Sequence, residues 1–231
     1  WPDAVKTMQR NWIGRSEGAE FEMKLCDESG KPDEQGRGIR VFTTRPDTSF
    51  GMTYAVLAPE HPLVADITTK ECSAAVADFV EQAGKATEED RLAVGAALEK
   101  RGVFTGAYLY NPFTRKPVPL YLADYVLMGY GTGAIMAVPG QDQRDWDFAV
   151  SHGLPIIRTV APPEGWEGEA YTEDGPAINS EWLDGLEVAE AKEKAISWLE
   201  AEALGERKVN YCLRDWGVSR QRYWGCPIPD G

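Results

Sequence analysis

Short stretches in which hydrophobic and polar residues alternate, or in which β-branched and aromatic residues gather, recur along the chain and predict β-strands. They fall at residues 20–25, 39–44, 53–58, 105–110, 118–126, 133–138, 156–160 and 209–216. A helical spacing of apolar residues occurs in four other segments, at 73–83, 87–101, 142–151 and 188–204. The pattern favours an α+β fold with a β-barrel-like core and peripheral helices.

The two ends of the chain differ from its middle. Residues 1–37 are polar and turn-rich around one strand, and predict an N-terminal linker strand and turn region before a core at 38–205. Residues 206–231 contain a basic and aromatic run, Ser-Arg-Gln-Arg-Tyr-Trp-Gly at 219–225, which an isolated domain has little reason to expose. We expect the chain ends to form an antiparallel two-stranded linker, and the chain to be excised from a larger protein.

Composition narrows the classes of partner. The 231 residues include 24 Lys or Arg and 37 Asp or Glu, for a formal net charge of −13, which argues against a broad basic face for nucleic acid. No apolar run approaches the roughly 18 residues that span a bilayer, so no membrane partner is expected. Four cysteines without a CxxC pair and only two histidines argue against a metal site and favour a reducing cytoplasm.

The run Thr-Thr-Arg-Pro-Asp-Thr at 43–48 follows an apolar strand. Taken by itself it is most simply a strand end and a turn, because Pro fixes φ and Asp and Thr hydrogen-bond to nearby backbone. Three threonine hydroxyls and an arginine around one turn could equally grip a ribose or position a water molecule. The residues alone leave both interpretations open.

A second polar run, Asp-Gln-Arg-Asp at 142–145, begins a helix directly after another apolar strand. Asp142 and Asp145 lie three residues apart and share one helix face, where a free ammonium group would find a carboxylate. Capping and the helix dipole explain Asp142 well, but they explain Asp145, one turn further in, less well.

Taken together, these motifs resemble the editing domain of leucyl-tRNA synthetases, also called connective peptide 1. The similarity covers nearly the whole chain, and the order and spacing of its motifs make it specific. The matching runs are Asn-Trp-Ile-Gly-Arg-Ser at 11–16, Thr-Thr-Arg-Pro-Asp-Thr at 43–48, Tyr-Gly-Thr-Gly-Ala at 130–134, Met-Ala-Val-Pro at 136–139, Asp-Gln-Arg-Asp at 142–145, and Leu-Arg-Asp-Trp at 213–216 through Gly225.

Details of the motifs favour the leucyl enzyme over its isoleucyl and valyl relatives. Asp47 stands where those relatives usually have Glu, and Arg144 lies between the two aspartates of the acidic motif. One departure is Gln141, at a position where many leucyl sequences have His. An amide does not titrate near neutral pH, so Gln141 is assigned no proton-transfer role.

The resemblance implies hydrolysis of the ester in mischarged leucine-accepting tRNA. A single methylene is worth only about 1–3 kcal/mol of discrimination, so norvaline and isoleucine are attached by error and must be removed at a second site. The implied catalytic residues are Thr43 and Thr44, which would hold the terminal ribose or ester and position water, and Asp145, which would bind the α-ammonium group. Thr48 would exclude leucine by narrowing the side-chain pocket, and Arg45 would support the loop and a nearby phosphate.

Further substrate-binding residues are implied by position. Four apolar or aromatic side chains would form the wall around the adenosine and the amino acid, with ordinary core packing as the alternative: Leu127, Tyr130, Met136 and Val138. Three charged residues complete the set: Asp47, Asp142 and Arg144.

The residues contain no obvious side-chain nucleophile, since no GxSxG run is present and no cysteine has a motif partner. Direct attack by a positioned water therefore fits best, with no cofactor for editing. His61 and His152 lie too far apart for the nucleotide-binding signature of a class I synthetase, so ATP would be used only by an absent catalytic domain.

The expected partners are the 3′ end of aminoacylated tRNA(Leu) and the remainder of the synthetase chain, with the protein a monomer. A non-catalytic module that binds the acceptor end of tRNA is the main alternative, and a free-standing hydrolase of small esters is another.

Overall fold

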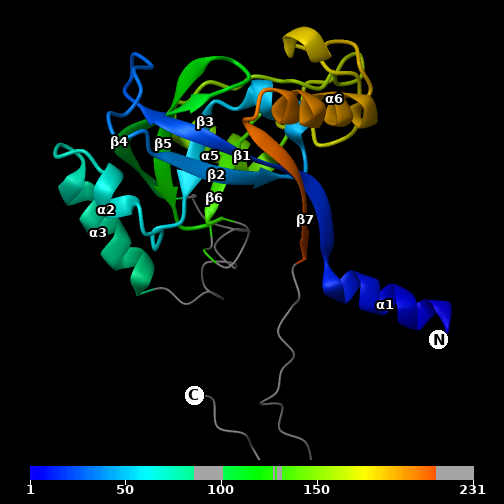
Figure 1. Cartoon of the computed structure of the whole chain (residues 1–231), viewed down its shortest axis with the longest axis horizontal. Helices are drawn as coiled ribbons and strands as arrows, with labels where there is room; N and C mark the ends of the chain where they lie inside the picture. Colours follow the sequence, from blue (N-terminus) through cyan, green and yellow to red (C-terminus); the bar gives the residue numbers. More distant parts are fainter. Residues whose placement is uncertain (86–100, 127, 129–131, 212–231) are drawn as a thin grey trace, which may run out of the picture. The chain divides into compact units, whose positions relative to one another are not determined.

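The computed structural model describes residues 1–85, 101–126, 128 and 132–211. Two compact units divide the chain: Gly18–Lys208 form the larger, and Trp1–Glu17 with Val209–Gly231 form the smaller. In the larger unit, helices lie around a mixed β-sheet (Figure 1). The α+β class is therefore confirmed. None of the described helices is both long and apolar enough to cross a membrane.

Seven described strands form one sheet, in the order β2-β1-β4-β5-β3-β6, with β7 also paired to β1. Their bounds are β1 Arg15–Cys26, β2 Gly38–Thr43, β3 Tyr54–Leu57, β4 Gly102–Asn111, β5 Lys116–Ala123, β6 Ala134–Ala137 and β7 Gly205–Tyr211. The pairings β1–β2, β1–β4, β4–β5 and β3–β6 are antiparallel, and β3–β5 is parallel. No ladder joins β2 to β6 among these strands, so the sheet is open where a barrel-like core was predicted.

The helices precede, connect or follow the strands along the chain. They are α1 Asp3–Ile13, α2 Val64–Ile67, α3 Ser73–Gly84, α5 Gln143–His152 and α6 Val188–Ala201, with 3-10 helices η1 at Pro46–Gly51 and η2 at Glu181–Leu183. The predictions for α3, α5 and α6 are confirmed, and α5 ends at Gly153 in the left-handed conformation, as the sequence indicates. The helix predicted at 87–101 lies outside the described residues except for Arg101.

Helix α1 was not predicted, because its segment is mostly polar, although its few apolar residues have helical spacing. Local signals mark its two ends: Asp3 lies in the first turn, where it pairs with Lys6 at 3.1 Å, and Gly14 ends the helix at φ 54°. The predicted strand at 156–160 is also wrong, since this segment has a single bridge, between Val160 and Ala177. Its backbone packs closely against Gly140, whose missing side chain permits the approach.

Two hydrogen bonds show that β1 and the segment 204–211 run antiparallel to each other. In the larger unit the N–H of Glu22 donates to the carbonyl of Leu204 at 3.2 Å, and in the smaller unit Ser16 Oγ donates to the carbonyl of Asn210 at 3.4 Å. The strand predicted at 209–216 is described only to Tyr211, within β7. The antiparallel two-stranded linker expected from the chain ends stays a prediction.

Two clusters of buried residues hold the larger unit together. The first lies between the sheet and α6, and aromatic contacts tie it to η1: Phe50 packs edge-on against Phe113, with ring centroids 5.6 Å apart, and Phe113 lies 4.9 Å from Trp198. The second contains Tyr54 and Phe148 and lies between β3 and α5. The two clusters anchor the segments that carry the two sequence motifs.

Candidate functional site

The first motif begins where β2 ends. Thr43 is the last residue of the strand, and its hydroxyl oxygen accepts a hydrogen bond of 3.0 Å from the backbone N–H of Arg45. Pro46 then opens η1, where its fixed φ suits a helical turn. Gly18 of β1 passes so close that a Cβ there would overlap the carbonyl of Thr43. A glycine within an alternating strand is a sequence signal for such an approach, and this contact was not predicted.

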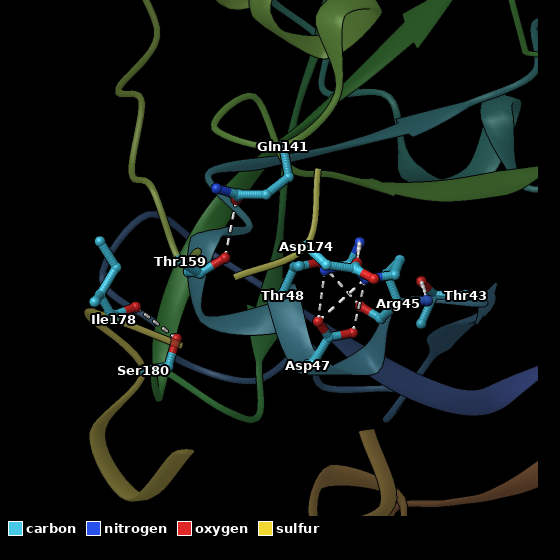
Figure 2. A network of polar contacts seen from close by, with 9 residues as sticks. All are labelled: Thr43, Arg45, Asp47, Thr48, Gln141, Thr159, Asp174, Ile178 and Ser180. Carbon is cyan, nitrogen blue, oxygen red and sulfur yellow. Dashed lines mark hydrogen bonds and ion pairs between the residues drawn. The ribbon is translucent and has the colours of Figure 1, made fainter. Parts of the chain in front are cut away.

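An ion pair fixes the turn from within. Asp47, 3% exposed, accepts hydrogen bonds from Nε and Nη2 of Arg45 at 3.0 and 2.8 Å (Figure 2). Arg45 is 28% exposed, and its Nη1 lies 3.9 Å from Asp174. Such a forked pair constrains the guanidinium plane. The structural interpretation of Asp47, as a residue that holds the turn, therefore has direct support.

Thr48 is 1% exposed, and its hydroxyl forms a hydrogen bond within the same turn. Both Oγ1 and the backbone N–H of Thr48 donate to the carbonyl of Arg45, at 2.9 and 3.1 Å. With the hydroxyl engaged in this way, Thr48 would discriminate between side chains by its size and not by a hydrogen bond.

The second motif forms the first turn of α5. Asp142 is its N-cap, and its Oδ1 accepts hydrogen bonds from the backbone N–H groups of Arg144 and Asp145 at 2.8 and 3.3 Å. The Arg144 guanidinium returns to the same carboxylate, with Nη2 3.1 Å from Oδ2. Burial alone would raise the pKa of Asp142, but the Arg144 charge and the hydrogen bonds outweigh it and hold that pKa below its usual range.

This capping predicts a pH dependence. A carboxylate whose pKa is lowered by folding stabilises the protein above its unfolded pKa of about 3.9, and this stabilisation disappears as the pH falls through the folded value. We expect Asp142→Ala to lower the free energy of unfolding by about 1 kcal/mol at neutral pH and by much less near about pH 3. Urea unfolding of both proteins at several pH values measures the difference, with Asp147→Ala in the same helix as control. A difference that is the same at both pH values would contradict the role of the Asp142 charge.

Asp145 differs from Asp142 in being almost fully buried, at 6% exposed. Its Oδ2 accepts a hydrogen bond of 2.8 Å from the backbone N–H of Val138, and its own carbonyl accepts one of 3.1 Å from the Tyr54 hydroxyl. A carboxylate in such surroundings binds a cation more strongly than one in water does, because the local dielectric constant is low. This is the chemistry that an α-ammonium group requires.

Contacts between η1 and the end of β6 bring the two motifs to the same region. Ser49 Oγ donates to Met136 Sδ at 3.5 Å, and Gly51 packs against Val138. Met136 and Val138 are both buried within the first cluster, so core packing accounts for most of their surface. Thr44, in the bend after β2, is exposed. Leu127 and Tyr130 lie outside the described residues.

Gln141 takes part in a contact that the sequence did not indicate. Its Oε1 accepts a hydrogen bond of 2.9 Å from Thr159, which links the start of α5 to the segment before Val160 (Figure 2). Among the described residues, no three His, Cys, Asp or Glu side chains gather closely enough to hold a metal ion.

Comparison with known proteins gives the family. A family model described as "Leucyl-tRNA synthetase, editing domain" matches residues 10–200. The chain is similar to leucine-tRNA ligases from Rubrobacter xylanophilus, at 53% identity over 99% of this chain and 27% of that protein, and from Herpetosiphon aurantiacus, at 54% over 99% and 28%. Its fold is similar to a crystal structure described as the ternary complex of Agrobacterium radiobacter K84 agnB2 LeuRS-tRNA-LeuAMS, with TM-score 0.67, 37% identity, and coverage of 99% of this chain and 24% of that chain.

A mixed sheet that carries a hydroxyl-rich turn beside a buried carboxylate is thus the arrangement of a synthetase editing domain. The chain belongs to the family of leucyl-tRNA synthetase editing domains. It spans about a quarter of the length of the ligases that it matches.

Proposed function

We propose that the chain is a post-transfer editing domain, which hydrolyses the ester of mischarged tRNA(Leu) and excludes leucine. The observation that carries this proposal is the buried Asp145 carboxylate at the start of α5, held by the N–H of Val138. A buried carboxylate attracts an opposite charge strongly, because the local dielectric constant is low. The α-ammonium group of an aminoacyl ester provides that charge.

In the proposed reaction, a water molecule attacks the ester carbonyl carbon, and the bond from that carbon to the ribose oxygen breaks. The products are the free amino acid and uncharged tRNA. Thr43 and Thr44, at the end of β2, would hold the terminal ribose or ester and position the water, while Asp145 orients the substrate through its ammonium group. Orientation and hydrogen bonding to the developing oxyanion would supply most of the rate, because an ester is already activated.

Other residues of the motifs would shape the pocket. Thr48 would exclude the branched side chain of leucine, and Arg45, fixed by Asp47, would support the loop and a nearby phosphate. Four further side chains are proposed to complete the binding site: Leu127, Tyr130, Met136 and Val138. Asp142 and Arg144 would hold the first turn of α5.

The wider context follows from the same proposal. The core at 38–205 would lie between linkers at 1–37 and 206–231, which run antiparallel and join it to the rest of a monomeric, cytoplasmic synthetase. The absent body would provide most phosphate contacts to tRNA, which reconciles an RNA substrate with a net charge of −13. Editing would need no cofactor, and ATP would be used only by that body.

A deacylation assay tests the proposal. We expect this chain, or a full-length ligase that contains it, to release norvaline from norvalyl-tRNA(Leu) and to leave leucyl-tRNA(Leu) intact. The measurement is loss of radiolabelled amino acid from the tRNA, with buffer alone as the blank for spontaneous hydrolysis. Binding of the tRNA end without ester loss in the full-length ligase would contradict the proposal and favour a non-catalytic module.

A further inference from the structure

Tyr54, at the start of β3, contacts helix α5 at two places. It is fully buried, and its hydroxyl donates to the backbone carbonyl of Asp145 at 3.1 Å. Its ring stacks on Phe148, three residues further along α5, with centroids 5.1 Å apart and planes 14° from parallel. One side chain of the sheet therefore fixes both the first and the second turn of this helix.

The aromatic stack continues beyond Phe148. The Phe148 ring stacks in turn on His152 at 3.9 Å, and Tyr121 packs edge-on against both Tyr54 and Phe148. These contacts belong to the second buried cluster, in which α5 packs against the sheet. The helix rests on an aromatic layer, so it cannot shift along the sheet without breaking the stacks.

The Tyr54 hydroxyl is suited to be a permanent donor. Burial, together with the nearby Tyr125 and the negative charge of Asp145, raises the pKa of Tyr54 far above its usual value. It is therefore protonated at neutral pH, as a donor to the Asp145 carbonyl must be.

Asp145 is thus held from two sides. The N–H of Val138 fixes the carboxylate, and the Tyr54 hydroxyl fixes the backbone carbonyl of the same residue. The two donors come from β3 and from the end of β6, which are neighbouring strands of the sheet. An ammonium-binding group must be placed accurately, because small displacements of a charged partner reduce its contribution steeply.

We propose that Tyr54 is a positioning residue for the editing reaction, because its hydroxyl places Asp145 where the α-ammonium group of the substrate binds. The proposal rests on the proposed function of Asp145. It goes beyond that function by assigning a role to a buried residue of the sheet outside both motifs. The alternative is that Tyr54 only fills the core.

The variant Tyr54→Phe separates these two roles, since it keeps the stacked ring and removes only the hydroxyl. The test uses two substrates: norvalyl-tRNA(Leu), and the same ester after its α-amino group has been converted to a hydroxyl. We expect kcat/KM for norvalyl-tRNA to fall about tenfold, mainly through KM, as loss of one well-placed hydrogen bond implies. The hydroxy ester has no ammonium group, and its hydroxyl can form only a weaker hydrogen bond to the Asp145 carboxylate, so its kcat/KM should fall much less.

The decisive quantity is the kcat/KM for norvalyl-tRNA divided by the kcat/KM for the hydroxy ester, both measured on one protein preparation. This ratio does not depend on how much of the variant is folded, because unfolding lowers both values equally. Tyr121→Phe is the matched control: it removes a hydroxyl from the same aromatic layer, and no described contact joins that hydroxyl to α5. We expect its ratio to equal that of the unmodified protein.

An unchanged ratio in Tyr54→Phe, whether both esters lose activity or neither does, would overturn the positioning role. Asp145→Ala distinguishes this failure from failure of the proposed function. If Asp145→Ala lowers the ratio and Tyr54→Phe does not, only the proposal for Tyr54 fails. If neither variant changes the ratio, Asp145 does not bind the ammonium group, and the roles proposed for Asp145 and Tyr54 both fail. Absence of norvalyl-tRNA hydrolysis by the unmodified protein, in contrast, would be failure of the proposed editing function.

Discussion

Replacing Asp145 with alanine should reduce deacylation of norvalyl-tRNA(Leu) at least about 30-fold without unfolding the domain. Removal of one member of a desolvated charge pair costs about 2–5 kcal/mol, and here the other member is the substrate ammonium group. Asp145 is 6% exposed, so a water molecule in its place could not stabilise the substrate ammonium group as well as the carboxylate does. The measurement is single-turnover ester loss with enzyme in excess over tRNA.

The control for this variant is Asp147→Ala, which removes an exposed carboxylate two residues away in the same helix. It should deacylate norvalyl-tRNA at the unmodified rate. Circular dichroism and thermal unfolding of both variants establish that α5 is still formed. Asp145→Ala protein that is folded and still hydrolyses norvalyl-tRNA at the full rate would exclude Asp145 as the ammonium-binding group.

Truncation of Thr48 to alanine should increase an activity, namely hydrolysis of the correctly charged leucyl-tRNA(Leu). If the side chain excludes leucine by its size, a smaller residue should raise hydrolysis of leucyl-tRNA(Leu) by about 10- to 200-fold, the range that one to three kcal/mol of steric discrimination allows. In a full-length ligase, the result would be a failure to accumulate leucyl-tRNA.

Two further variants at position 48 show which part of the side chain is responsible. The hydroxyl donates to the carbonyl of Arg45, which also accepts the backbone N–H of residue 48, so loss of the hydroxyl leaves that carbonyl paired. Thr48→Val keeps the shape and should still exclude leucine. Thr48→Ser keeps the hydroxyl but loses a methyl group, and should admit leucine. If valine admits leucine and serine does not, the hydroxyl and not the size is the discriminating feature.

The sequence was most informative where local chemistry forms the structure. Helix α5 begins at an Asp that caps it and ends at a glycine in the left-handed conformation, and both signals lie within a few residues of the turns that they form. The strands around the two motifs were also predicted, because β-branched and aromatic residues gather there. Helix α1 was missed because its segment is mostly polar, although its few apolar residues have helical spacing and Gly14 ends it in the left-handed conformation.

Long-range contacts were not predictable from the same residues. The stretch at 156–160 has the composition of a strand, but no neighbouring strand pairs with it beyond one bridge, because close packing against Gly140 determines its path. The barrel-like closure was an extrapolation from the number of strands, and the described sheet is open. Pairing partners depend on how the whole sheet is assembled, and a strand's own sequence does not specify them.

The sequence by itself therefore determined the family, the two motifs and the carboxylate expected to bind the substrate, since order and spacing of chemical groups are properties of the chain. Only the tertiary structure decided that Asp47 is engaged by Arg45, that the Thr48 hydroxyl serves the turn, and that Tyr54 holds Asp145 from the neighbouring sheet. The physical reason is that each of these roles depends on burial and on the direction of a hydrogen bond, which exist only after distant segments have packed together.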